Sequence, residues 1–136
     1  MEYRLYVNGK CKNSRSFQSD IGIGGVILDE KGREISFSRN LGKGTCFEGH
    51  IYAIRLGVEE ILKNGDATRI SIYLPNLMLV NYFNGFNVDI SNNTRNLATS
   101  LKFFLDNSNI QMNFNYFEAN EYNYLLDLVE DAINIS

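Results

Sequence analysis

The stretch Tyr3-Arg-Leu-Tyr-Val-Asn-Gly-Lys10 alternates apolar with mostly polar residues. Tyr3, Leu5 and Val7 share one side, and a period of two predicts a β-strand with one buried face. The segments that follow place this strand in the middle of a sheet, with antiparallel neighbours on one side and a parallel neighbour on the other. Such a strand delivers the residue at its carboxyl end, Asn8, to a crevice, so Asn8 is the first candidate site residue.

Two more strand patterns come next. Residues 21–28, Ile-Gly-Ile-Gly-Gly-Val-Ile-Leu, form a glycine-spaced apolar run, and residues 33–39 alternate with Ile35 and Phe37 expected to face inward. Asp29-Glu-Lys-Gly32 between them predicts a hairpin turn in which glycine supplies the positive φ. Three glycines within one strand indicate a close approach, either by a packing helix or by a ligand.

Helical patterns dominate the rest of the chain. Thr45 begins the first helix, Glu48 completes a capping box, and Asn64-Gly65 ends the helix. Residues 69–74 predict a strand that Pro75 stops, because proline cannot donate to the ladder. The later elements are expected at 76–83 (a short helix), 94–106 (helix), 110–116 (strand) and 121–133 (helix). The order β-β-β-α-β-α-α-β-α predicts an α/β fold with a five-stranded mixed sheet flanked by helices.

Length and composition restrict the class of protein. With 136 residues, 44% of them hydrophobic and 21% charged, residues 1–136 are expected to form a single globular domain. No apolar run approaches the ~20 residues of a membrane helix and no secretory leader is present, so we expect a cytoplasmic or otherwise intracellular protein without a membrane partner. The net charge of −3 argues against a protein whose main role is to bind the phosphate backbones of nucleic acids.

Cys11 and Cys46 are the only cysteines and lie far apart in the sequence. Two cysteines make a metal site improbable, and free thiols are expected. Cys46, at the start of a helix, is a candidate activated thiol because a helix N-terminus favours the thiolate. We favour an ordinary thiol, since no positioned base is identifiable nearby.

The element order and four sequence pieces resemble the ribonuclease H family over nearly the whole chain. Residues 3–10 are similar to the family's Tyr-Val-Asp-Gly-Ser, and residues 24–34 to its second strand and hairpin. Residues 70–81 are similar to Ile-Tyr-Thr-Asp-Ser-Gln-Leu-Leu-Val-Asn, and residues 123–129 to its closing Asn-x-x-Ala-Asp-x-Leu-Ala helix. The resemblance implies a ribonuclease H-like fold and an enzyme that cuts RNA paired to DNA. It also implies two Mg²⁺ ions held by four carboxylates, which offset the repulsion between the cations.

Three of those four carboxylates are replaced here. The family's acids fall on Asn8, His50 and Pro75, and only Asp127 is an acid. We therefore interpret the chain as a degenerate member with no catalytic residues and no metal site. His50 could pair with Asp127 as an ion pair or half of a soft-metal site. A partly buried histidine satisfied by one hydrogen bond is the alternative that we favour.

Two other carboxylates are candidates for rebuilding the site. Glu48 would do so if the helix alignment slipped by two residues, but that slip rotates the helix by about 200°. Asp131 lies one turn after Asp127 on the last predicted helix. We favour the capping box as the role of Glu48 and a solvated helix face as the place of Asp131.

The residues with which the family reads its hybrid are replaced as well. Its two asparagines fall on Cys46 and Phe47, and its serine and glutamine after the fourth strand on Asn76 and Leu77. A basic helix that some members use has no counterpart, because residues 84–93 contain no lysine or arginine.

Few candidate nucleic-acid contacts remain. Lys10, Lys12 and Arg15 lie in and beside a polar loop predicted at residues 11–20, and Asn76 follows the fourth strand. For the basic residues we favour a solvated loop over phosphate contacts.

We expect a catalytically inactive ribonuclease H-like domain that acts as a binding module. Protein association, including self-association, ranks ahead of binding to an RNA/DNA hybrid, because the chain is acidic and rich in tyrosine and phenylalanine. Tyr82, Phe83 and Phe86 are a candidate docking patch, with core packing as the favoured alternative. The different hypothesis is an active, metal-dependent endoribonuclease that cleaves the RNA strand of hybrids through a rearranged Mg²⁺ or Mn²⁺ site. Otherwise no cofactor is expected.

Overall fold

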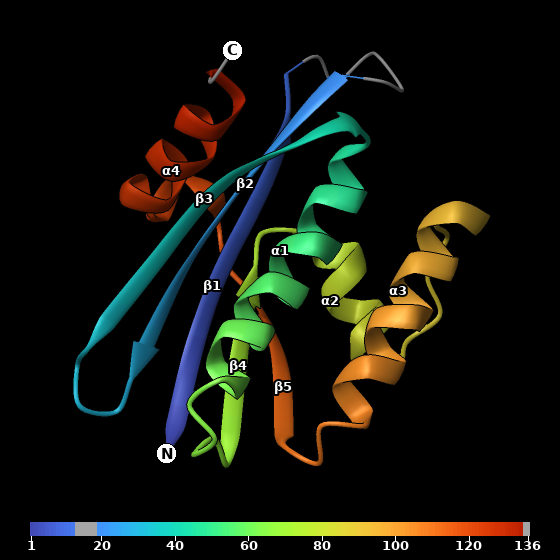
Figure 1. Cartoon of the computed structure of the whole chain (residues 1–136). Coiled ribbons are helices and arrows are strands. Elements are labelled where there is room, and N and C mark those ends of the chain that lie inside the picture. The colour runs from blue at the N-terminus through green and yellow to red at the C-terminus, as the bar shows by residue number, and fades with distance from the viewer. Residues whose placement is uncertain (13–18, 135–136) are drawn as a thin grey trace.

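The computed structural model describes residues 1–12 and 19–134, which form a five-stranded mixed sheet with helices on both faces (Figure 1). The elements in chain order are β1 (Glu2–Cys11), β2 (Ser19–Asp29), β3 (Glu34–Gly44), α1 (Cys46–Leu62), β4 (Arg69–Leu74), α2 (Leu77–Phe83), α3 (Asn92–Asp106), β5 (Gln111–Tyr116), the short 3-10 turn η1 (Ala119–Glu121) and α4 (Asn123–Asn134). The order and the α/β class predicted from the sequence are confirmed.

The strand that opens the chain lies in the middle of the sheet, as predicted. The strand order is β3-β2-β1-β4-β5, and β1 pairs antiparallel with β2 and parallel with β4. Because β1, β4 and β5 run in the same direction, their carboxyl ends meet at one edge of the sheet. This edge is where a site in an open α/β sheet is expected.

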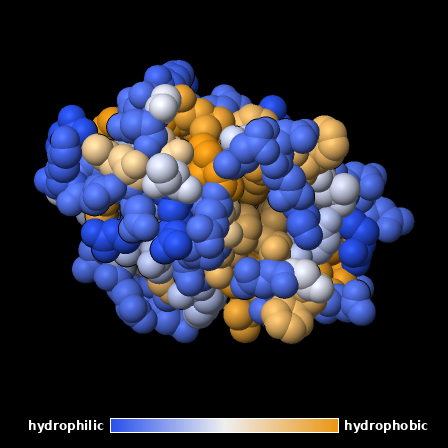
Figure 2. Space-filling model, turned by 90° about the horizontal axis from the view of Figure 1, so that it is seen from below, coloured by the Kyte–Doolittle hydropathy of each residue, from blue (hydrophilic) through white to orange (hydrophobic). Residues whose placement is uncertain are grey.

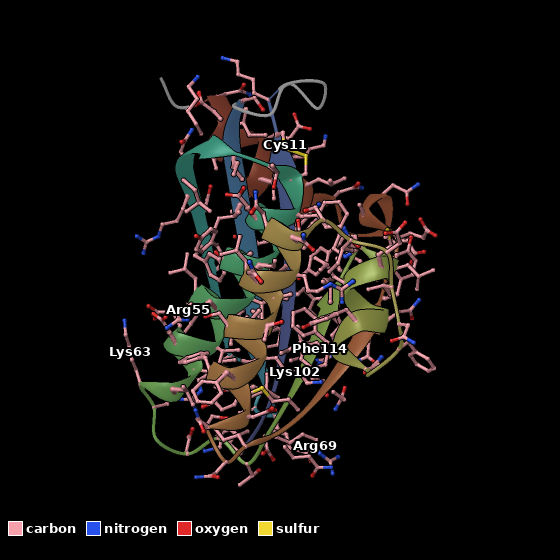
Figure 3. The ribbon with its side chains drawn as sticks, turned by 90° about the vertical axis from the view of Figure 1, so that its right-hand side faces the viewer. Cys11, Arg55, Lys63, Arg69, Lys102 and Phe114 are labelled. Carbon is pink, nitrogen blue, oxygen red and sulfur yellow. A yellow bond between two sulfur atoms is a disulfide. The ribbon has the colours of Figure 1, made fainter. Side chains whose placement is uncertain are left out.

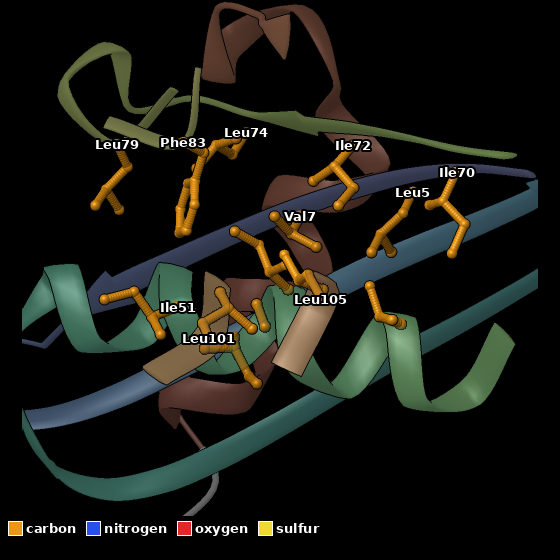
Figure 4. Close-up of a cluster of buried hydrophobic side chains, with 14 of the residues drawn as sticks. Leu5, Val7, Ile51, Ile70, Ile72, Leu74, Leu79, Phe83, Leu101 and Leu105 are labelled. Carbon is orange, nitrogen blue, oxygen red and sulfur yellow. The ribbon is translucent and has the colours of Figure 1, made fainter. Parts of the chain in front are cut away.

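One face of the sheet carries the main core, which α1, α2 and α3 cover (Figures 1 and 4). Leu5 and Val7 of β1 are fully buried on this face, as their alternation predicts. Gly57 lets α1 approach closely, because the Leu5 side chain occupies the place where a Cβ would stand. Burial of each such aliphatic side chain contributes about 1.5–3 kcal/mol.

The opposite face is covered by α4, and this helix explains Gly22 and Gly24 of β2. A Cβ on Gly22 would lie 2.6 Å from the carbonyl oxygen of Val129, and one on Gly24 would lie 3.0 Å from Cβ of Leu128. The ring of Phe37, from β3, occupies the corresponding space over Gly25. Of the two explanations left open by the sequence, a packing helix is confirmed at Gly22 and Gly24, whereas at Gly25 the close neighbour is the ring of Phe37 on the adjacent strand.

Strand β3 differs from the prediction in its length and in the exposure of one side chain that was expected to face inward. It runs over Glu34–Gly44 instead of residues 33–39, and Ile35, expected to face inward, is 51% exposed. The reason is that β3 is an edge strand, and near the hairpin it borders an open groove of about 600 Å³. Phe37, also expected inward, is half-buried and packs against the core.

Other boundaries differ for local reasons. Both ends of the loop predicted at residues 11–20 belong to strands, since β1 includes Cys11 and β2 begins at Ser19, and residues 13–18 of this prediction lie outside the described residues. The last predicted helix is interrupted at Tyr122, whose φ of −128° and ψ of 81° separate η1 from α4. Helix α3 begins at Asn92, two residues early, directly after its cap Ser91.

The Ser91 cap gives a first testable prediction. Its hydroxyl accepts a hydrogen bond from the backbone N–H of Thr94 at 3.2 Å. Ser91→Ala is expected to lower the free energy of unfolding by about 1 kcal/mol, because that N–H loses its partner. Ser100→Ala, at an exposed position of the same helix, is the matched control and is expected to change it by less than about 0.5 kcal/mol. Urea unfolding of both variants tests this, and equal midpoints would contradict it.

Candidate functional site

The candidate site lies where the carboxyl ends of β1 and β4 meet. The last paired residues of these parallel strands are Tyr6 and Tyr73, and Asn8 and Pro75 each follow two residues later. Gly9 brings the first turns of α1 against β1, since a Cβ at this position would lie 3.0 Å from the backbone nitrogen of His50. Asn8, Pro75 and His50 are therefore gathered at one end of the sheet.

Asn8 is buried, with 4% of its surface exposed, and faces away from the main core. It pairs with Gly24 of β2, the glycine on which α4 packs. Its side-chain oxygen accepts a hydrogen bond from the backbone N–H of Gly9 at 2.8 Å. The amide thus has a local structural role and supplies no negative charge.

His50 lies on the buried face of α1 and is 6% exposed. Burial alone lowers the pKa of its imidazole to about 4, so the ring is neutral at pH 7. Its Nδ1 atom has no hydrogen-bond partner among the described residues. Buried polar atoms without a partner are rare in native proteins, and a neutral imidazole is the form in which such an atom costs least.

His50 and Asp127 do not form the ion pair that the sequence analysis considered as the less favoured hypothesis. No ion pair of His50 occurs in the described part of the chain, and the pKa of His50 is lowered where a carboxylate partner would raise it. Of the favoured alternative, the ring is fully buried and not partly buried, and its one hydrogen bond stays a prediction for Nε2, because Nδ1 has no partner among the described residues. Asp127 itself is exposed on α4, so its carboxylate is directed to water.

The other carboxylates do not rebuild the site. Glu48 accepts a hydrogen bond from the hydroxyl of Thr45 at 3.2 Å, and its backbone N–H donates to the same hydroxyl at 3.3 Å. It therefore has the capping role expected from the sequence. Asp131 is exposed on α4. Within residues 1–12 and 19–134, no three histidine, cysteine, aspartate or glutamate side chains gather where they could hold a metal ion.

The expectation of free thiols is wrong, because Cys11 and Cys46 form a disulfide with a Cα–Cα distance of 5.3 Å (Figure 3). The bond joins the last residue of β1 to the first residue of α1. The close contact of Gly9 with the start of α1 brings the two cysteines together, although 35 residues separate them. Cys46 is accordingly neither a free nor an activated thiol in this state.

The residues considered for nucleic-acid contacts have different roles in the structure. Lys10 forms an ion pair with Glu130 of α4 at 2.9 Å, and this ammonium holds the pKa of the Glu130 carboxyl below its usual range. Lys12 is exposed, and Arg15 lies outside the described residues. Asn76 caps α2, since its side-chain oxygen accepts a hydrogen bond from Leu79 N–H at 3.1 Å.

An aromatic cluster that the sequence analysis missed lies directly beside the site. Tyr6 and Tyr73 stack across β1 and β4 with ring centroids 4.5 Å apart. Phe117 and Tyr122 contact Tyr6 edge-on, at 5.8 and 5.2 Å. The sequence held a usable signal for part of this cluster. Tyr6 and Tyr73 lie two residues before Asn8 and Pro75, and residues two apart along a strand share a face.

Comparison with solved structures gives close matches in shape over the whole chain. LC11 ribonuclease H1, which comes from compost by a metagenomic approach, was solved in complex with an RNA/DNA hybrid. It matches with a TM-score of 0.85 and 18% identity, over 97% of this chain and 96% of that one. Ribonuclease H1 from the halophilic archaeon Halobacterium salinarum matches with a TM-score of 0.82 and 12% identity, over 100% of both chains. The N-terminal ribonuclease H domain of a Mycobacterium tuberculosis protein matches with 0.81 and 15%, over 98% of this chain and 94% of that one.

This chain has a ribonuclease H-like fold. No protein-family model matches its sequence, and no curated protein does. At 12–18% identity the likeness to the solved structures establishes the fold and leaves the activity open.

Within the ribonuclease H-like fold, the residues of this chain do not fit two Mg²⁺ ions. Paired divalent cations need several anionic oxygens, and the positions that the resemblance assigns to them hold a neutral amide, a buried neutral imidazole, a pyrrolidine ring and one exposed carboxylate. We therefore derive no metal-dependent step at this end of the sheet.

Proposed function

We propose that this ribonuclease H-like chain is a catalytically inactive binding module. The observation that carries the proposal is the replacement of three of the four expected carboxylates by Asn8, His50 and Pro75, with His50 buried and uncharged. A site without clustered anions has little affinity for paired divalent cations. The same proposal includes two further points. Residues 1–136 form a single domain, and the protein is intracellular.

Protein association is the binding role that we rank first. The positions matching the family's hybrid-reading asparagines hold Phe47 and the disulfide-bonded Cys46, neither of which reads a base edge. Lys10, beside them, is neutralised by its ion pair with Glu130. Among the described residues, no helix is long and apolar enough to cross a bilayer.

Exposed apolar side chains on and beside α2 support this ranking. Leu77 and Phe86 are 54% and 65% exposed, and the Phe86 N–H donates to the Asn81 carbonyl, which brings Phe86 back to α2. The patch considered from the sequence is thus divided, since Phe83 is buried, Tyr82 is half-buried and only Phe86 is exposed. At the opposite end of the sheet from the site, seen from below, apolar residues also gather in patches between hydrophilic ones (Figure 2). Exposed apolar patches are typical of protein interaction surfaces.

A cleavage assay tests the absence of catalysis. A labelled RNA/DNA hybrid incubated with the chain and millimolar Mg²⁺ or Mn²⁺ is expected to stay intact, because one exposed carboxylate cannot assemble a two-metal site. Metal-dependent cleavage that Asp127→Asn abolishes would overturn the proposal in favour of an active ribonuclease H. Asp131→Asn, which removes an exposed carboxylate one turn away, is the matched control.

Sedimentation over a range of concentrations tests the association, with a second copy of the chain as the partner. We expect the sedimentation coefficient to rise with concentration, and Leu77→Ser with Phe86→Ser to reduce that rise. Phe103→Ser, at a 70% exposed position on α3, is the control and is expected to leave it unchanged. Tight hybrid binding with a steep salt dependence, combined with no self-association, would instead favour the nucleic-acid role.

A further inference from the structure

We propose that β3 is an interface at which a second copy of this chain adds its own β3, antiparallel, so that the two sheets become one. This interface is additional to the association surface proposed above and does not depend on it. That surface lies on and beside α2, which contacts β5 at the other edge of the sheet. Unpaired backbone groups, the centre of the strand and the charges beside it support the proposal.

Strand β3 presents a row of backbone groups to which no other strand of the described chain is bonded. It is the first strand in the sheet order and forms one edge (Figure 1). The N–H of Asp29 donates to the carbonyl of Arg33 at 3.1 Å, and bonded pairs alternate along an antiparallel ladder. The odd-numbered residues of 35–39 therefore bond to β2. The groups that point away from β2 belong to Glu34, Ser36, Ser38 and Asn40.

The middle of this edge lacks the features with which proteins prevent such pairing. Edge strands are usually protected by proline, by charged side chains or by a bulge. Residues 35–38, Ile-Ser-Phe-Ser, contain neither proline nor a charge, and the irregularity in the β2–β3 ladder comes only beyond Asn40. A regular stretch of edge is thus open to another strand, which would add by main-chain hydrogen bonds.

The centre of this regular stretch indicates the register. The ladder is regular over residues 34–40, and its centre is Phe37. A two-fold axis at Phe37 pairs the whole stretch with the same stretch of the second copy. An axis one residue earlier would place Arg39 opposite Arg33 of the second copy, and an axis one residue later would extend the pairing into the irregular part of the strand.

In this register each copy adds an arginine to a groove of the other. Ile35 lies opposite Arg39 of the second copy in a non-hydrogen-bonded pair, in which opposite side chains approach most closely. Ile35 is 51% exposed, and it lines the groove of about 600 Å³ together with Asp29 and Asp66. The aliphatic stem of Arg39 covers Ile35, and its guanidinium extends toward this groove.

The charges of the groove and of Arg39 are complementary. Asp29 and Arg33 of the lining neutralise each other in their 2.7 Å ion pair. Asp66 accepts a hydrogen bond from the Tyr3 hydroxyl at 2.6 Å, but it has no ion-pair partner among the described residues. Exposed Arg39 also has none within residues 1–12 and 19–134. A second copy therefore brings an unpaired cation to an unpaired anion, twice by symmetry.

Charge substitutions at position 35 test the register. They are made in the chain that carries Leu77→Ser and Phe86→Ser, so that the α2 surface does not contribute, and sedimentation gives the dissociation constant of the dimer. Ile35→Lys places like charges opposite Arg39 and is expected to raise this constant roughly tenfold more than Ile35→Glu, which places opposite charges there. No dimer in the starting chain, or equal effects of the two substitutions, would overturn the proposal.

Reversal of the opposite charge supplies the rescue. Adding Arg39→Glu to Ile35→Lys is expected to return the dissociation constant to within roughly threefold of its starting value, because opposite charges again face each other. Lys102→Glu, which makes the same change of charge on α3, is the matched control and is expected to rescue nothing. Equal rescue by both would show that only net charge matters and would overturn the register.

Amide hydrogen exchange followed by NMR locates the interface in the same starting chain without any charged substitution. The N–H groups of Ser36 and Ser38 point away from β2 in the single chain and are bonded in the dimer. We expect both to exchange roughly tenfold more slowly at a concentration at which the dimer predominates. The amides of β5, the other edge strand, are the control and are expected to keep their rates. Dimers in which Ser36 and Ser38 exchange as fast as in the single chain would overturn the proposal.

Discussion

Replacing both cysteines, by Cys11→Ser together with Cys46→Ser, is expected to lower the free energy of unfolding by roughly 4 kcal/mol. The disulfide closes a loop between residues 35 apart in the sequence, and it therefore restricts the unfolded chain far more than the folded one. In thermal unfolding the same loss corresponds to a decrease in Tm of roughly 14 °C for a chain of this length. Urea and thermal unfolding of the variant and the oxidised parent measure both quantities.

A reductant supplies the internal control for this prediction. Reduced parent protein is expected to unfold at the midpoint of the double serine variant, and the reductant is expected to leave that variant unchanged. Agreement of the two would assign the whole effect to the bond between Cys11 and Cys46. An oxidised parent that unfolds together with the variant would show that the bond contributes nothing to stability.

Much of the fold could be predicted because the spacing of apolar residues in most segments agrees with the way those segments are buried in the folded chain. The alternation of Tyr3, Leu5 and Val7 gave a strand with one buried face, and all three are buried. Ile35 has an equally good alternation and is exposed, because a period of two identifies the two faces of a strand and does not show which part of a face is covered. Coverage near the hairpin depends on where the helices end, which is a property of the tertiary structure.

The disulfide could not be predicted from spacing, since 35 residues separate its cysteines. The signal that could have found it was the resemblance to ribonuclease H. That fold places the end of the first strand beside the start of the first helix, and the two cysteines stand at those two points. The number of cysteines favours free thiols in a chain with only two. It does not show that the fold brings these two cysteines close together.

The burial of His50 had a clear signal in the sequence. His50, Ile54, Val58 and Ile61 follow the helical spacing of one face, and all four are buried. What spacing does not show is whether a buried polar group finds a partner. That depends on which groups the tertiary structure brings to the ring, and here none accepts or donates at Nδ1 within the described residues.

Acidification is expected to destabilise the chain through His50, the only histidine. The pKa of the His50 imidazole in the folded state is about 4, whereas histidine in an unfolded chain has a pKa of ~6.5. Between these values the unfolded chain binds a proton that the folded chain does not bind, so stability is complete above pH ~6.5 and falls as the pH falls toward about 4. Between pH 7 and pH 4.5 the expected loss from this one group is about 2.5 kcal/mol.

Urea unfolding of the parent and of His50→Gln at both pH values isolates the contribution of His50 to the loss of stability. Carboxylates titrate in both proteins, so their contribution cancels in the difference between the two pH dependences. The parent is expected to lose about 2.5 kcal/mol more than the variant, and the NMR titration of the His50 ring protons is expected to have its midpoint near 4. Equal acid sensitivity of the two proteins would assign the loss to carboxylates. A ring midpoint of ~6.5 would place the imidazole in water and contradict a buried, neutral histidine at this end of the sheet.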